Sequence, residues 1–127
     1  MRQAQDATIV LDIGKTNVKL VLLDADGIVL SELRSPNTIV QDGPYPHHDT
    51  DRIWAWMLDG MRTFATQAHV GAIVPVTHGA TAALVDDEGL VLPVLDYEYE
   101  MPESPHAPYE AKRPPSSPPI RRCCRRA

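Results

Sequence analysis

Apolar runs alternate with polar turn segments along the first third of the chain. The runs occupy 8–11, 18–23 and 28–33, and the polar breaks between them are 12–17 and 24–27. Both breaks contain glycine and aspartate, which favour tight turns because they tolerate a positive φ angle. The pattern predicts three strands in an antiparallel meander.

The hydrophobic period changes in the middle of the chain. A segment with three prolines and a glycine predicts a loop over 35–48. Apolar residues then recur at helical spacing, at Ile53, Met57, Met61, Phe64 and Ala68. This period predicts an amphipathic helix, with candidate N-caps at Asp49, Thr50 and Asp51. Gly60 lies within the helix and is typical of a helix face that packs closely on a sheet.

Three more apolar runs follow the helix and predict strands over 70–76, 82–85 and 90–95. The last two are separated by an acidic, glycine-ended turn at 86–89. A meander followed by a crossover helix and further strands predicts a mixed sheet covered by helices. The predicted fold class is therefore α/β.

Charge divides the chain into two unlike parts. Residues 1–102 contain 6 Lys and Arg against 15 Asp and Glu, a net −9, whereas residues 103–127 contain 6 against 2, a net +4. Half of the 12 prolines and both cysteines also lie after residue 102. Prolines at this density exclude a helix or a central strand. We therefore expect a folded part over 1–102 and an irregular Pro/Arg-rich tail over 103–127.

The tail has two interpretations. Its last residues are Arg, Pro, Ser and Cys with few apolar residues, as in a gene translated out of frame, so a truncated or frameshifted product is the leading interpretation. A basic tail that binds RNA or an anionic surface is the alternative. The vicinal pair Cys123 and Cys124 does not easily form a disulfide with itself.

Overall composition excludes several classes of protein. The content of 43% hydrophobic and 23% charged residues excludes wholesale disorder. No apolar run reaches the roughly 18 residues of a membrane span, and the polar N-terminus predicts no secretory signal. We expect a cytoplasmic protein. The net charge of −5 disfavours nucleic acid as the main partner.

The segment 12–19, DIGKTNVK, contains a carboxylate, a glycine, a hydroxyl and two cations between apolar strands. A glycine turn can direct backbone N–H groups at one point and so bind an anion. Thr16, Lys15 and Lys19 offer further donors, and Asp12 could hold a metal ion or its water. These groups suit a polyphosphate with magnesium. The GxxxxGK[ST] pattern of a Walker A loop is absent. An ordinary hairpin turn with solvated lysines is the alternative.

The order Asp-x-Gly-x-Thr-x-x-Lys in this segment resembles the first phosphate segment of the sugar kinase, actin and Hsp70 ATPase superfamily. The later segment 72–81, AIVPVTHGAT, followed by a strand ending in Asp86, a turn at Gly89 and Leu92-Pro93, resembles the FGGY carbohydrate kinases. Its HGAT piece is similar to xylulokinases, and the general spacing also fits rhamnulokinases and fuculokinases. The resemblance covers about 8–102 and implies a partial ribonuclease-H-like, actin-like ATPase domain.

The resemblance implies a role for each matching residue. It places the phosphates of ATP at Gly14, Lys15, Thr16, Asn17 and Lys19, and Mg²⁺ at Asp12. Lys15 departs from the commoner threonine or serine, so it either strengthens phosphate binding or points to solvent. The resemblance also implies sugar contacts at His78, Gly79 and Asp96. A satisfied loop histidine is the alternative for His78, and a solvated strand end is the alternative for Asp96.

The resemblance also implies what this chain lacks. In the FGGY family the catalytic aspartate lies downstream of the matched segment, and the second phosphate loop and adenosine pocket belong to a second lobe. We therefore expect the N-terminal part of an ATP-dependent kinase for a ketose such as xylulose, rhamnulose or fuculose, inactive alone and a candidate homodimer at full length. A standalone nucleotide- or partner-binding module with a basic tail is the alternative.

Two other groups of residues are weaker candidates. His47, His48, Asp49 and Asp51 are of metal-binding types, but adjacent histidines in a proline-rich loop are more often solvated, and such aspartates are more often N-caps. Trp54 and Trp56 lie on the predicted helix, where we expect them in the core or an interface rather than as a stacking platform.

Overall fold

The computed structural model describes residues 6–100, 111, 112 and 114. Its main sheet has the strand order β3-β2-β1-β6. The antiparallel meander consists of β1 (Ala7–Ile13), β2 (Asn17–Leu23) and β3 (Val29–Pro36), and β6 (Val70–Thr77) pairs with β1 in parallel. The predicted meander and the mixed α/β sheet are confirmed. Most of the predicted tail at 103–127 lies outside the described residues.

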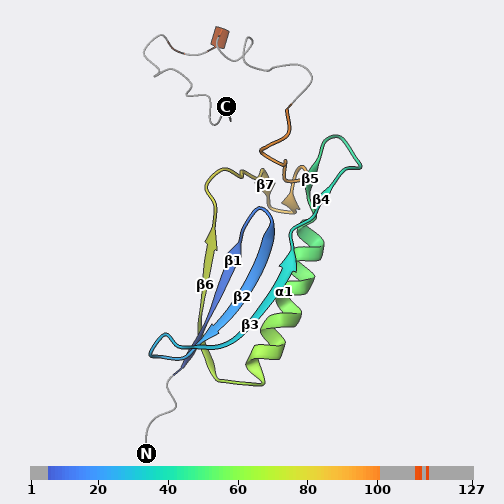
Figure 1. Cartoon of the computed structure of the whole chain (residues 1–127). Helices are drawn as coiled ribbons and strands as arrows, with labels where there is room; N and C mark the ends of the chain where they lie inside the picture. The colour runs from blue at the N-terminus through green and yellow to red at the C-terminus, as the bar shows by residue number, and fades with distance from the viewer. Residues whose placement is uncertain (1–5, 101–110, 113, 115–127) are drawn as a thin grey trace, which may run out of the picture.

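One helix, α1 (Thr50–Ala65), lies against one face of this sheet (Figure 1). Its N-cap is Asp49, whose carboxylate accepts a hydrogen bond from the Arg52 amide at 3.1 Å, so one of the candidate N-caps is confirmed. The helix presents its apolar stripe to alternate residues of the first two strands. The core so formed contains Ala7, Ile9, Leu11, Val18, Leu20, Leu22, Ile53, Met57 and Phe64. The helix ends before the predicted Ala68, with Thr66 as its C-cap.

Gly60 is the point at which the helix approaches the sheet most tightly. A Cβ atom on Gly60 would lie 2.5 Å from Cδ1 of Leu20, a side chain that is fully buried. Overpacking of a core costs about 1–3 kcal/mol, whereas replacing glycine by alanine in a helix gains up to about 1 kcal/mol. We therefore expect Gly60→Ala to lower the free energy of unfolding by about 1–2 kcal/mol in urea denaturation.

The control for this prediction is Gly79→Ala, because a Cβ atom there meets nothing within 4 Å. We expect that change to stay within about 0.5 kcal/mol of the parent chain. Equal effects of the two substitutions would show that helix propensity, not close packing, determines the outcome at Gly60.

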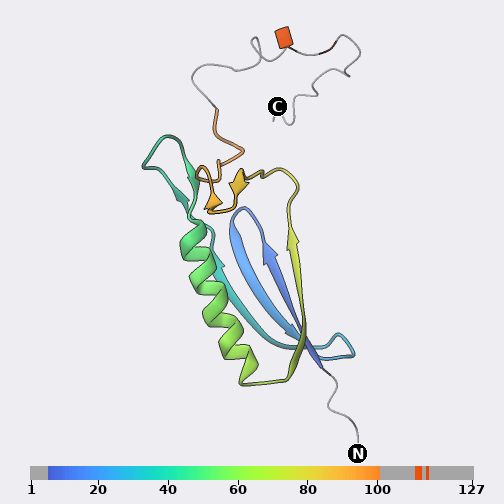
Figure 2. The same ribbon diagram turned by 180° about the vertical axis from the view of Figure 1, so that it is seen from behind.

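The opposite face of the sheet is covered by no helix within residues 6–100 (Figure 2). The alternation of β1, β2 and β6 places Val10, Val21, Val74 and Val76 on this face. Val74 and Val76 remain 44% and 48% exposed. An apolar sheet face is therefore open to solvent in this part of the molecule.

The two strands predicted after β6 are wrong in length. Only β7 (Val85–Asp86) and β8 (Gly89–Leu90) pair, around the predicted turn. The Asp86 carboxylate closes that turn by accepting hydrogen bonds from the amides of Glu88 and Gly89. The flanking apolar side chains of Leu84, Val91 and Leu92 remain exposed, because nothing in the described residues packs over them. Pro93 has no backbone N–H to donate to a neighbouring strand, which also limits the pairing.

The predicted loop at 35–48 is also partly wrong. The strand β3 continues to Pro36, and β4 (Ile39–Val40) pairs with β5 (His47–His48). This pairing depends on a distant segment, since the amide of His48 donates to the Val94 carbonyl at 2.9 Å. The Asp96 amide likewise donates to the Pro46 carbonyl at 3.0 Å. The periodicity of hydrophobic residues gives no information about such contacts between loops that are distant along the chain.

These short segments gather at one end of the main sheet, above the turn between β1 and β2 (Figures 1 and 2). The start of α1 and the end of β6 lie at the same end. All residues predicted to bind phosphate or sugar therefore come from this end of the molecule. In the described part of the chain, no helix has both the length and the apolar character needed to cross a membrane.

Candidate functional site

The turn between β1 and β2 contains the predicted phosphate-binding residues. The Gly14 amide donates to the Asn17 carbonyl at 2.9 Å, which closes the turn, and Thr16 and Asn17 are exposed. Asp12 and Lys19 are register partners on the neighbouring strands. A carboxylate and an ammonium thus lie side by side on the uncovered face, next to an accessible hydroxyl. These groups can meet a phosphate and its metal ion from solvent.

The side chain of Lys15, in the same turn, is bound to the segment that follows β8. Its Nζ atom is 3.0 Å from Oδ1 of Asp96, contacts the Glu98 carboxylate, and lies 4.9 Å from the centroid of the Tyr97 ring. The alternative that Lys15 points to solvent is therefore wrong. Desolvation acts to lower the pKa of Lys15, but the hydrogen bonds to Glu98 and Asp96 outweigh it and raise the pKa above its usual value.

Asp96 joins the segment after β8 to the turn between β1 and β2. Its side chain is only 14% exposed, so the alternative of a solvated strand end is wrong. Desolvation acts to raise its pKa, but hydrogen bonds from the Lys15 ammonium and the Glu98 amide lower the pKa of Asp96 overall. The carboxylate is therefore ionised at neutral pH and holds residues 96–98 beside the turn between β1 and β2.

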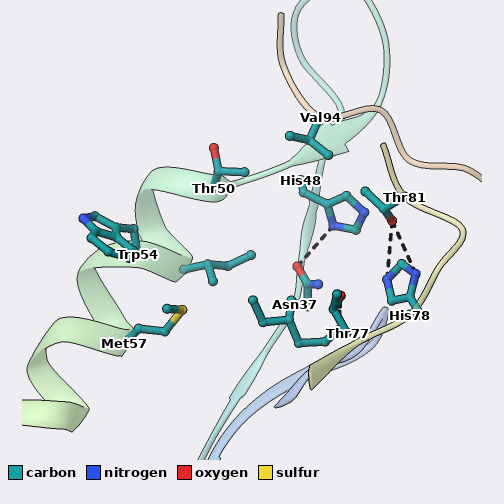
Figure 3. Close-up of a pocket in the computed structure, with 11 residues that line it drawn as sticks. Asn37, His48, Thr50, Trp54, Met57, Thr77, His78, Thr81 and Val94 are labelled. Carbon is teal, nitrogen blue, oxygen red and sulfur yellow. Dashed lines mark hydrogen bonds between the residues drawn. The ribbon is translucent and has the colours of Figure 1, made fainter. Parts of the chain in front are cut away.

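A pocket of about 360 Å³ opens beside this ion pair. Figure 3 shows the rings of His48 and His78 on one side of the pocket, and Trp54 and Met57 of α1 on the other. One wall is thus polar and the other largely apolar. The lining residues are Ile13, Asn37, His48, Thr50, Ile53, Trp54, Met57, Thr77, His78, Thr81 and Val94.

His78 is at the pocket, as the predicted sugar contact requires. The Thr81 hydroxyl lies 3.4 Å from its Nδ1 atom, and the ring of Tyr97 lies 5.2 Å from its own ring, centroid to centroid. Gly79 and Asp96 do not line the pocket. Asp96 is nevertheless connected to it, because Tyr97 contacts both His78 and the ammonium of Lys15.

His48 departs most from its predicted role. It is 6% exposed, so the prediction of a solvated histidine is wrong. Its burial follows from the pairing of β4 with β5 and the docking of Val94. Desolvation lowers the pKa of His48 below the usual 6.5, and Lys15, His47 and His78 act in the same direction, while Asp96 opposes them. The ring is therefore neutral at neutral pH.

The buried ring predicts a stability change in mildly acidic solution. The unfolded chain takes up a proton at this histidine near pH 6.5, whereas the folded chain does so only at lower pH. We expect the free energy of unfolding to fall as the pH drops below about 6.5, by at most about 1.4 kcal/mol per pH unit. The measurement is urea denaturation between pH 7 and pH 5, with His48→Phe as the comparison. An unchanged slope in that variant would contradict the assignment.

Several residues at the pocket were not predicted from the sequence. Asn37, Thr77 and Thr81 are common polar residues in segments without a motif, and only the pairing of distant segments brings them together. Of the two positions expected for the tryptophans, Trp56 packs against the core. Trp54 is 59% exposed and lines the pocket, so it lies outside the core, and an interface position for it stays a prediction. Within the described ranges, no cluster of three or more His, Cys, Asp or Glu side chains is arranged to hold a metal ion.

Comparison with known proteins gives a consistent result. No family model matches the chain. The curated protein L-fuculokinase of Escherichia coli K12 is 27% identical over 101 residues, which cover 74% of this chain and 21% of that protein. This chain therefore spans about a fifth of the length of the curated relatives that it matches.

Solved structures agree with the sequence match. A carbohydrate kinase from Novosphingobium aromaticivorans superposes with a TM-score of 0.76 at 38% identity, over 89% of this chain and 24% of that one. A xylulose kinase from Rhodospirillum rubrum superposes with a TM-score of 0.64 at 22% identity, over 84% of this chain and 24% of that one. The chain is thus similar to part of a carbohydrate kinase in sequence and in fold.

Proposed function

We propose that this chain, which is similar in sequence and fold to part of a carbohydrate kinase, is the N-terminal part of an FGGY-type carbohydrate kinase. It would supply the phosphate loop and one wall of the sugar pocket of that enzyme. The whole enzyme would transfer the γ-phosphate of ATP to a hydroxyl group of a ketose such as xylulose, rhamnulose or fuculose. The observation that carries this proposal is the pocket with His78 at the same end of the sheet as the turn between β1 and β2.

The phosphate side of the proposed site uses the exposed groups of that turn. Gly14, Thr16, Asn17 and Lys19 would contact the phosphates of ATP, and Asp12 would hold Mg²⁺ or its water. Magnesium supplies charge neutralisation on the transferred phosphoryl group when bound. We propose that Lys15 acts indirectly, because its ammonium is already paired with Asp96 and Glu98.

The sugar side of the proposed site uses the pocket. His78 can accept from or donate to a hydroxyl group, and the apolar wall from α1 can contact the C–H face of a sugar ring or chain. Gly79 directly follows His78, and the space beside it is open, because a Cβ atom there would meet nothing within 4 Å; we propose that the sugar reaches it from this side. Asp96 would position the pocket through Lys15 and Tyr97 rather than line it.

The remaining parts of the reaction belong to the length that this chain does not share with its relatives, since the matched part makes up only 21% of the fuculokinase and 24% of the carbohydrate kinase. We propose that this length supplies the base for the attacking hydroxyl, the second phosphate loop and the adenosine pocket, and covers the open sheet face. The chain alone is expected to show no ketose-dependent formation of ADP. The whole enzyme would act in the cytoplasm, as a homodimer.

A chimera tests the proposal. Residues 7–100 of this chain would replace the segment of the Novosphingobium aromaticivorans carbohydrate kinase that superposes on them. We expect ketose-dependent formation of ADP with at least one of xylulose, rhamnulose and fuculose. A folded chimera that is inactive with all three ketoses, beside an active parent kinase, would contradict the proposal.

A further inference from the structure

One residue that lines the pocket has a buried side-chain polar atom without a hydrogen-bond partner among the described residues. This atom is Nε2 of His48, which neither accepts nor donates a hydrogen bond within the described residues. The residue as a whole is 94% buried. A buried polar atom left without a partner destabilises the fold, because it has lost its hydrogen bond to water and gained none in return. His48 lines the pocket beside His78 and Thr81 (Figure 3). The unpaired nitrogen is therefore a candidate contact for a ligand.

Two linked hydrogen bonds determine which ring nitrogen of His48 carries the proton. The side-chain nitrogen of Asn37, Nδ2, donates to the Gly14 carbonyl at 2.7 Å. The side-chain oxygen of Asn37, Oδ1, is therefore the atom that faces His48. That oxygen lies 3.4 Å from Nδ1 of His48. Since the oxygen can only accept, Nδ1 carries the proton of the neutral ring. Nε2 is then left with a lone pair and can only accept a hydrogen bond.

We propose that Nε2 of His48 accepts a hydrogen bond from a hydroxyl group of the carbohydrate in this pocket, and that Asn37 is the positioning residue that holds the ring in this state. The proposal rests on the proposed function and names a specificity-determining contact within it. A hydroxyl group satisfies the lone pair. A carboxylate or phosphate oxygen at the same point would place two acceptors against each other, so the pocket selects a neutral hydroxyl there.

The same hydrogen bonds connect sugar recognition to the phosphate side. Asn37 donates to the carbonyl of Gly14, which lies in the turn between β1 and β2. The backbone N–H of Asn37 also donates to the Thr16 carbonyl at 2.9 Å. The residue that orients the sugar acceptor is thus bonded on both sides to the turn proposed to bind ATP.

The first test uses the 127-residue chain itself. Nitrogen-15 NMR of the imidazole groups is expected to show His48 protonated at Nδ1 and bare at Nε2. Addition of D-xylulose, L-rhamnulose or L-fuculose is expected to shift the Nε2 resonance of His48 for at least one of the three ketoses. A ring protonated at Nε2, or an Nε2 resonance that none of the ketoses shifts, would overturn the proposal.

Substitutions separate recognition from folding. His48→Phe keeps a ring of similar shape but removes the acceptor, and we expect the affinity for the responding ketose to fall roughly tenfold with the fold retained. The matched control is His47→Phe, because Nδ1 of His47 is bonded to the Tyr45 carbonyl and the residue lies outside the pocket lining. Asn37→Ala is expected to give a mixture of both His48 tautomers. Equal affinities in the two histidine variants would overturn the proposal.

The chimera distinguishes this proposal from the kinase function. An active chimera in which His48→Phe leaves KM for the ketose unchanged would overturn the role of His48 and leave the kinase function standing. An inactive chimera, together with a ketose-dependent shift at Nε2 in the present chain, would overturn the kinase function and support the hydroxyl contact.

Discussion

Phe64→Ala is expected to remove about 3–5 kcal/mol of folding free energy, the range observed when a large buried aromatic side chain is truncated. Phe64 is fully buried between the last turns of α1 and the sheet. Small domains have total stabilities of about 5–15 kcal/mol. With one sheet face open, we expect this chain to lie at the low end of that range. The substitution should therefore leave a large part of the chain unfolded in buffer.

Far-UV circular dichroism during urea denaturation measures this effect. The matched control is Trp54→Ala on the same helix, because Trp54 is 59% exposed and loses little packing on truncation. We expect that control to change the free energy of unfolding by less than about 1 kcal/mol. A Phe64→Ala chain with the stability of the parent would show that the contact between α1 and the sheet does not hold the fold together.

Asp12→Asn in the chimera with the Novosphingobium aromaticivorans kinase is expected to lower kcat/KM roughly a thousandfold. A bound metal ion contributes several kcal/mol to stabilising the charge of a phosphoryl transition state, and about 1.4 kcal/mol corresponds to a factor of ten. The substitution keeps the shape of the side chain and removes the charge that would hold Mg²⁺ or its water. Lys19, its partner across the strands, remains in place.

Steady-state kinetics over a range of magnesium concentrations checks this result. Asp26→Asn is the matched control, since Asp26 is an exposed carboxylate in the turn between β2 and β3. We expect Asp26→Asn to keep full activity and both variants to keep the melting temperature of the chimera. A loss of less than tenfold for Asp12→Asn would contradict the assignment of Asp12 to the metal ion.

The elements that the sequence predicted well are those whose contacts are local. The alternation of Ile9, Leu11, Leu20 and Leu22 repeats the geometry of a half-buried strand, and the helical spacing from Ile53 to Phe64 repeats that of a helix. Asp49 and Gly60 also carried a local signal, one as an N-cap and the other as a small residue at a close approach. Each prediction needed only a short window of sequence.

The candidate site was harder to predict because its partners are distant along the chain. Lys15 pairs with Asp96 across 81 positions, and His48 is buried by Val94. The type and spacing of residues indicated the phosphate turn and His78. They could not show that Lys15 is already paired, or that His48 is buried with one nitrogen free, because both facts depend on how the two loop segments dock.

The parallel pairing of β6 with β1 has a consequence for the order of events during synthesis. The meander and α1 consist of contacts between nearby residues, so they can form as soon as they leave the ribosome. The hydroxyl of Thr77 donates to the Ile13 carbonyl, 64 positions earlier. This contact can stabilise the fold only after the long intervening segment has been closed into a loop, which costs conformational entropy. Because His78 and Thr81 follow directly, we expect the polar wall of the pocket to assemble last, after the core is already in place.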